Sequence, residues 1–100
     1  MDFHRALELE PQDPKKCVRL ADYYLEEGHF ALAFQYIRKA IGIAPSFPSI
    51  YYVRAKIYRE LSYLSMAIED LVRASDLHLL RGEFTEFWNL IDELRREFLD

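Results

Sequence analysis

The side chains that most often perform catalysis are few in this sequence and stand far apart. The three histidines, His4, His29 and His78, lie in different segments, and no two have the spacing of a zinc-binding helix. The single cysteine, Cys17, excludes an internal disulfide framework and a multi-cysteine zinc site. The acidic residues are spread along faces that we expect to be solvated, and no glycine-rich phosphate-binding loop is present. The sequence therefore predicts no enzyme activity, no cofactor and no metal site.

The composition limits the classes of partner. The 100 residues are 51% hydrophobic and 30% charged, which suits a single folded domain. The chain has 13 lysines and arginines against 17 aspartates and glutamates, a net charge of −4, which argues against nucleic acid or an anionic membrane as partner. No apolar run is long enough to span a bilayer, and the first residues do not form a secretory signal. We therefore expect a cytoplasmic protein that makes no membrane contact.

An internal period of 34 residues organises the chain. Residues 14–47 set against 48–81 share six identical pairs, and three of these are alanine pairs: Pro14/Pro48, Ala21/Ala55, Tyr24/Tyr58, Glu26/Glu60, Ala33/Ala67 and Ala40/Ala74. The same offset extends backwards, since Ala6 matches Ala40 and Pro11 matches Pro45. We therefore predict a half-repeat helix over residues 2–10, a first repeat over 14–47 and a second repeat over 48–81.

Each repeat is predicted to form two helices. The first helix of the first repeat has an apolar stripe at helical spacing, formed by Cys17, Leu20, Ala21 and Tyr24. Asp13-Pro14 supplies a capping side chain and a proline at its start, and Gly28 supplies its end. The second helix has its own stripe, formed by Phe30, Ala33, Phe34, Ile37, Ala40 and Ile41. Because Cys17 lies on an inward stripe, an inert buried thiol is favoured over a nucleophile.

The second repeat follows the same plan with two departures. Its turn, Ser62-Tyr63, has no glycine, and Leu79 stands where the first repeat has Pro45. The missing proline predicts that the helix from Leu64 continues to about Leu80. Beyond it the period fails, and residues 83–98 are predicted to form an amphipathic capping helix whose apolar face is Phe84, Phe87, Trp88, Ile91, Leu94 and Phe98. We expect this face to pack inward, because a bare end of the array would expose a large apolar patch.

The pattern resembles the tetratricopeptide repeat family. The residues that carry the resemblance are Leu20-Ala21-x-x-Tyr24, Gly28-x-Phe30, Ala33-x-x-x-Ile37-x-x-Ala40 and Pro45 in the first repeat, and Arg54-Ala55-x-x-Tyr58, Ala67-x-x-x-Leu71 and Ala74 in the second. Cys17 and Tyr51 depart from it, since the family often has tryptophan there. The resemblance implies an all-α, right-handed superhelical array of antiparallel helical hairpins that acts as a protein–protein interaction scaffold.

The resemblance places a partner-binding groove on the first helices of the two repeats. The side chains expected to line it are Lys15, Val18, Asp22, Leu25, Glu26, Ser49, Tyr52, Lys56, Arg59 and Glu60. The ligand would be a peptide segment or helix of another protein, with Tyr52 and Arg59 as anchors. Reversing the charges of Lys56 and Arg59 is expected to abolish binding without changing the stability of the fold. For each residue the alternative interpretation is an ordinary solvated face.

Two other modes of binding follow from the resemblance. One tetratricopeptide subclass clamps acidic chaperone tails, but Val18 and Asp22 replace the donors it needs, so this sequence predicts no such clamp. The alternative function is homo-oligomerisation or array assembly through the terminal helices. The N-terminal residues Phe3, Leu7 and Leu9 and the aromatic residues after Gly82 are the candidates for it.

Overall fold

The computed structural model describes residues 13–99, and every regular element in that range is helical. The elements are α2 (Pro14–Glu26), α3 (Phe30–Ile43), α4 (Pro48–Glu60), α5 (Leu64–Leu80), α6 (Phe84–Leu94) and a π-helical turn, η1 (Arg95–Leu99). The expected all-α array is confirmed, and so is the continuation of α5 to Leu80. The half-repeat helix predicted at 2–10 lies outside the described residues.

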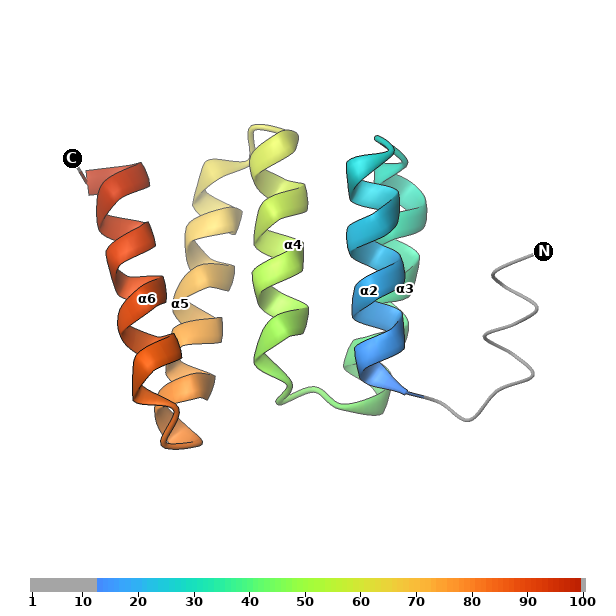
Figure 1. Cartoon of the computed structure of the whole chain (residues 1–100). Coiled ribbons are helices and arrows are strands. Elements are labelled where there is room, and N and C mark those ends of the chain that lie inside the picture. Colours follow the sequence, from blue (N-terminus) through green and yellow to red (C-terminus); the bar gives the residue numbers. More distant parts are fainter. Residues whose placement is uncertain (1–12, 100) are drawn as a thin grey trace.

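The helices form consecutive antiparallel hairpins. In Figure 1, α2 lies in front of α3 and α6 lies in front of α5, while α4 stands between the two pairs. Close packing joins α2 to α3, α4 to α5 and α5 to α6, and a smaller contact joins α4 to α2 and α3. The faces of α2, α4 and α6 therefore lie on one side of the molecule.

The start of α2 is capped as the sequence predicts. The Asp13 carboxylate accepts a hydrogen bond from the Lys15 backbone N–H at 3.0 Å, and Pro14 occupies the first turn, where no backbone donor is needed. The linker of residues 44–47 between α3 and α4 is held by a side chain of the next helix, because the Tyr51 hydroxyl donates to the Pro45 carbonyl at 2.6 Å. The two repeats are thus joined by a short connection with a fixed anchor.

Three turns of the molecule share one geometry. Each has a residue with positive φ, namely Gly28 at 79°, Ser62 at 65° and Gly82 at 73°. In each turn the N–H of the following residue donates to the carbonyl five positions earlier, in the pairs His29/Tyr24 at 2.8 Å, Tyr63/Tyr58 at 2.8 Å and Glu83/His78 at 2.9 Å. The turn predicted at Ser62-Tyr63 is confirmed without a glycine. Ser62 therefore holds a left-handed conformation that disfavours a side chain.

The matched alanines lie in the core. Ala21, Ala33 and Ala40 of the first repeat are each 0% exposed, and their counterparts Ala55, Ala67 and Ala74 are 3%, 1% and 0% exposed. A small side chain at these positions lets neighbouring helices approach closely, and a larger one would overpack the contact. The burial predicted for these six positions is confirmed.

The interiors of the two hairpins differ at one matched position. In the first repeat it holds Tyr36, whose ring is buried and stacks on Tyr24 with centroids 5.7 Å apart and planes 4° from parallel. In the second repeat it holds Asp70, which is 2% exposed and accepts two hydrogen bonds from Arg54 at 2.7 and 2.9 Å. The expectation that acidic residues lie on solvated faces is therefore wrong for Asp70. A buried carboxylate is tolerated here because it is paired and hydrogen-bonded.

Arg54 is held on several sides. Its guanidinium carbon lies 5.3 Å from the centroid of the Tyr51 ring and 5.9 Å from that of Tyr58. A second arginine, Arg73, donates to Asp70 at 3.2 Å and also lies over Tyr51, at 5.2 Å. The hydrogen bonds to Asp70 raise the pKa of Arg54 above its ordinary value, although burial acts in the opposite direction. The second hairpin thus has a charged and aromatic interior.

The aromatic face of α6 is covered less than the sequence predicts. Leu90 is buried, but Phe84 and Trp88 are 59% and 61% exposed, so the expectation that both pack inward is wrong. The contact of α6 with the rest of the molecule therefore covers only part of its apolar face. The rings of Phe87 and Trp88 meet edge to face at 5.1 Å.

Candidate binding groove

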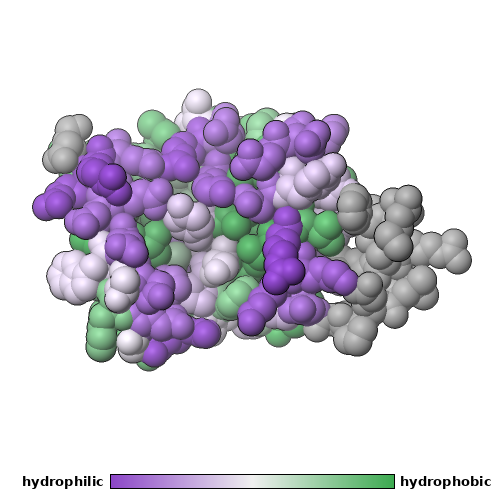
Figure 2. Space-filling model, viewed as in Figure 1, coloured by the Kyte–Doolittle hydropathy of each residue, from purple (hydrophilic) through white to green (hydrophobic). Residues whose placement is uncertain are grey.

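The predicted groove residues come from two helices that lie side by side. An ion pair joins the helices, with the Asp22 carboxylate of α2 2.7 Å from the Lys56 amine of α4. Hydrophilic side chains gather over the face of α2, α4 and α6 that is visible in Figure 2, and apolar side chains show between them. This surface of α2, α4 and α6 is called the groove below.

Two hollows follow the groove. The first has a volume of about 340 Å³ and is lined from α2 and α4 by Leu25, Glu26, Lys56, Arg59 and Glu60. The second, of about 330 Å³, is lined from α4, α5 and α6 by Ser49, Tyr52, His78, Glu86, Asn89, Leu90 and Glu93. The predicted residues of α4 are therefore shared between the two hollows.

Three of the predicted groove residues lie elsewhere or are mostly covered. Val18 and Leu25 are each 8% exposed and belong to the core, so a ligand would reach only their edges. Lys15 lines a separate hollow of about 400 Å³ beside Pro45 and Arg81. The hollows of the groove are therefore bordered mainly by charged and aromatic side chains.

Sequence reasoning missed the contribution of α6 to the groove. The Tyr52 hydroxyl lies 3.3 Å from Glu93 Oε1, to which it donates, and Arg59 forms an ion pair with Glu97. These partners are 41 and 38 residues apart, so no local spacing could have indicated either pair. Burial, followed by the Glu93 carboxylate, raises the pKa of Tyr52 above its ordinary value. The groove is therefore a three-helix surface.

These pairs change what a charge reversal of Lys56 and Arg59 would do. Lys56 is bonded to Asp22, and its amine lies 5.7 Å from the centroid of the Tyr52 ring, while Arg59 is bonded to Glu97. Reversing both charges would break two interhelical ion pairs as well as altering the groove. Each pair is partly exposed and contributes about 0.2–1 kcal/mol, so stability would change along with any binding.

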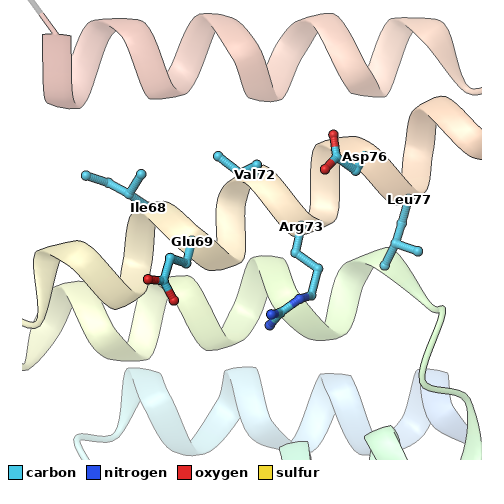
Figure 3. Close-up of a pocket in the computed structure, with 6 residues that line it drawn as sticks. All are labelled: Ile68, Glu69, Val72, Arg73, Asp76 and Leu77. Carbon is cyan, nitrogen blue, oxygen red and sulfur yellow. The ribbon is translucent and has the colours of Figure 1, made fainter.

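A further hollow lies on the outer face of α5, away from the predicted residues. It has a volume of about 440 Å³ and is lined by Ile68, Glu69, Val72, Arg73, Asp76 and Leu77. Figure 3 shows these side chains leaving α5 in two rows, with Ile68, Val72 and Asp76 pointing toward the α6 side. All six come from one helix, so this hollow is a depression on the surface of α5.

The described residues contain no other chemically distinctive site. Within 13–99, no three histidine, cysteine, aspartate or glutamate side chains are grouped to hold a metal ion, and no helix is long and apolar enough to cross a membrane. The Cys17 side chain is fully buried, as predicted, and burial raises the pKa of its thiol. A raised pKa disfavours the reactive thiolate.

Consecutive hairpins with alanines at matched positions place the molecule in the class of helical-repeat proteins. The family model for the tetratricopeptide repeat matches residues 17–47 and 48–77, more than half of the chain, and the chain belongs to this family. Neither a curated protein sequence nor a solved structure matches the chain. Tetratricopeptide repeats are generally protein–protein interaction modules and typically non-catalytic scaffolds.

Proposed function

We propose that the groove binds a peptide segment or helix of another protein. The observation that carries the proposal is that predicted residues of α2 and α4 line the first hollow together, and predicted residues of α4 line the second. Leu25 at the first hollow and Leu90 at the second give each an apolar contact bordered by polar groups. An apolar centre with a polar rim is the usual arrangement of a protein interface.

Blocking both hollows tests the proposal. Peptides would be selected on the wild-type chain from a display library of random 16-residue sequences, and their affinities measured by fluorescence anisotropy. The variant Glu26→Trp/Ser49→Trp places a bulky ring in each hollow and is expected to weaken binding at least tenfold, or about 1.4 kcal/mol. The matched control Ser65→Trp/Glu69→Trp makes the same changes on exposed positions of α5 and is expected to bind normally. Equal binding by the two variants would remove the groove from consideration.

A second candidate function is self-association through α6. The exposed apolar side chains Leu80, Phe84 and Trp88 lie at this end of the array, at 83%, 59% and 61% exposure, and such a patch is typical of an interaction site. We expect two copies to pair through their α6 ends, a tail-to-tail dimer, and not α6 of one copy with α2 of the next. In α4, Ile50 and Ile57 are buried apolar residues, whereas α2 has Lys16 and Tyr23 at the matched positions. The face of α2 is therefore less apolar than the matched face of α4.

Light scattering over a concentration series tests the second candidate. A tail-to-tail dimer is expected to dissociate on dilution, and Trp88→Lys is expected to keep the chain monomeric at all concentrations. The control Tyr23→Lys, at an exposed position of α2, should leave the dimer intact. A wild-type chain that stays monomeric at high concentration would exclude this function.

A further inference from the structure

We infer that the segment bound in the groove is basic, with lysine or arginine side chains seated in both hollows. The inference rests on the proposed function and adds the chemistry of the ligand to it. It follows from which charges along the groove already have a partner and which do not.

The two cations that line the first hollow, Lys56 and Arg59, already have carboxylate partners, and no lysine or arginine in the described part of the chain lines the second hollow. The Lys56 amine forms an ion pair with Asp22 Oδ1 at 2.7 Å, and Arg59 forms an ion pair with Glu97. An acidic ligand would have to displace an intramolecular carboxylate to reach either of them. Because such an exchange replaces one ion pair by another, it gives little net gain in binding free energy.

Four carboxylates of the two hollows have no such partner. Within residues 13–99, no lysine or arginine forms an ion pair with Glu26, Glu60, Glu86 or Glu93. The hydrogen bond that Glu93 receives comes from a neutral group, the Tyr52 hydroxyl. A ligand cation would therefore gain attraction at each hollow without breaking an existing pair.

The lining of the second hollow suits a long basic side chain. Leu90, 6% exposed, gives an apolar surface for the methylene groups of a lysine or arginine, and Glu86 and Glu93 lie on the same helix to receive its charged end. The Tyr52 ring lines the same hollow, but the Lys56 amine already lies 5.7 Å from its centroid, so the ligand cation is assigned to the carboxylates. His78 also lines it, but its Nδ1 is engaged with Glu83 at 2.9 Å.

The first hollow has charges of both signs, since two carboxylates and two cations line it. Glu26 of α2 and Glu60 of α4 line it beside the already paired Lys56 and Arg59. Leu25 contributes the apolar contact. The two hollows with their ion-pair partners hold six carboxylates and two cations: Asp22, Glu26, Glu60, Glu86, Glu93 and Glu97 against Lys56 and Arg59. The resulting potential favours a basic segment over an acidic one.

The peptides selected from the random library test this inference separately from the proposed function. Enrichment of lysine and arginine in peptides that the double tryptophan variant fails to bind is the expected result. Enrichment of aspartate and glutamate in such peptides would overturn the basic ligand and leave the groove proposal standing. Peptides that bind the tryptophan variant normally, or a library that yields none, would contradict the groove itself and this inference with it.

Neutral variants give the quantitative test. Glu86→Gln/Glu93→Gln keeps the shape of the second hollow and a hydrogen-bond acceptor for Tyr52. It is expected to weaken a selected basic peptide about fivefold at low salt and less at high salt, since partly exposed charge pairs are weak and screened. The matched control Glu69→Gln/Asp76→Asn removes the same charge from the outer face of α5 and should bind like wild type. Equal weakening by both variants would show only a net-charge effect and would overturn the assignment.

Discussion

The two repeats share a backbone plan but differ in what fills it. Both hairpins have buried alanines at the same positions and the same hydrogen-bonded turn. In the interior of the first hairpin, the rings of Tyr24 and Tyr36 stack on each other. In the interior of the second, Arg54 donates hydrogen bonds to Asp70. The small residues and turns therefore specify the hairpin, and one interior position between them accepts either an aromatic ring or a paired charge.

The largest effect is expected from breaking the charged interior. Arg54→Met removes two hydrogen bonds from Asp70 and leaves that buried carboxylate with Arg73 alone, so the free energy of unfolding should fall by about 3 kcal/mol. Urea denaturation measures it. Leu20→Met, at the matched position of the first repeat, should cost less than about 1.5 kcal/mol.

A double variant tests whether the two interiors are interchangeable. Arg54→Leu/Asp70→Tyr gives the second repeat the side chains that the first has at Leu20 and Tyr36, and it should recover most of the lost stability. A double variant no more stable than Arg54→Met would show that the backbone frames of the repeats differ more than their turns suggest.

Enlarging the shared alanines comes next. Ala33→Leu and Ala67→Leu should each lower the free energy of unfolding by about 1–3 kcal/mol, because both side chains are enclosed. The control Ala31→Leu changes an exposed position of α3, the helix that contains Ala33. Its free energy of unfolding should stay within about 0.5 kcal/mol of wild type. Thermal unfolding checks all three. A large difference between the free energies of unfolding of Ala33→Leu and Ala67→Leu would show that the two repeats do not share the same backbone arrangement at these positions.

Exchanging the turn residues should change the stability by a smaller amount, with opposite signs in the two turns. Ser62→Gly should stabilise the chain and Gly28→Ser should destabilise it, each by about 1 kcal/mol, since φ is 65° at Ser62 and 79° at Gly28. Chemical denaturation of the two variants measures both signs. Stabilisation by Gly28→Ser would show that the turns are not equivalent.

The third turn should differ from the other two in its response to pH. The His78 hydrogen bond is the main cause that lowers the pKa of Glu83 below its ordinary value. A lowered carboxylate pKa adds stability above the unfolded pKa, and this addition is lost as the pH falls through the folded value. The melting temperature of wild type should therefore exceed that of Glu83→Gln at pH 6, and the difference should shrink as the pH falls below the ordinary glutamate pKa of about 4.3. A difference that does not shrink with falling pH would exclude Glu83 ionisation as its cause.

Sequence periodicity predicted the frame of the molecule because local spacing encodes it. The alanines, the capped start at Asp13 and the length of α5 all follow from residues close in the chain. The pairing of Arg54 with Asp70 could not be predicted, because a charged residue on a helix is usually solvated and its partner is 16 residues away.

The site was predicted less completely than the frame for the same reason. Spacing placed the α2 and α4 side chains on one face, but it could not show that Tyr52 and Arg59 meet carboxylates of the C-terminal helix. It also identified the apolar face of α6 but not which part of that face is covered, since Phe84 and Trp88 are more than half exposed.

The helices are connected more weakly between α3 and α4 than between α4, α5 and α6. Tight hydrogen-bonded turns join α4 to α5 and α5 to α6, and side-chain pairs tie α4 to the C-terminal segment. Across the linker of residues 44–47 the attachments include a partly exposed ion pair, Asp22–Lys56, and one tilted ring contact, Phe34–Tyr58. Under mechanical tension the chain should therefore part first between α3 and α4, into a two-helix piece and a three-helix piece.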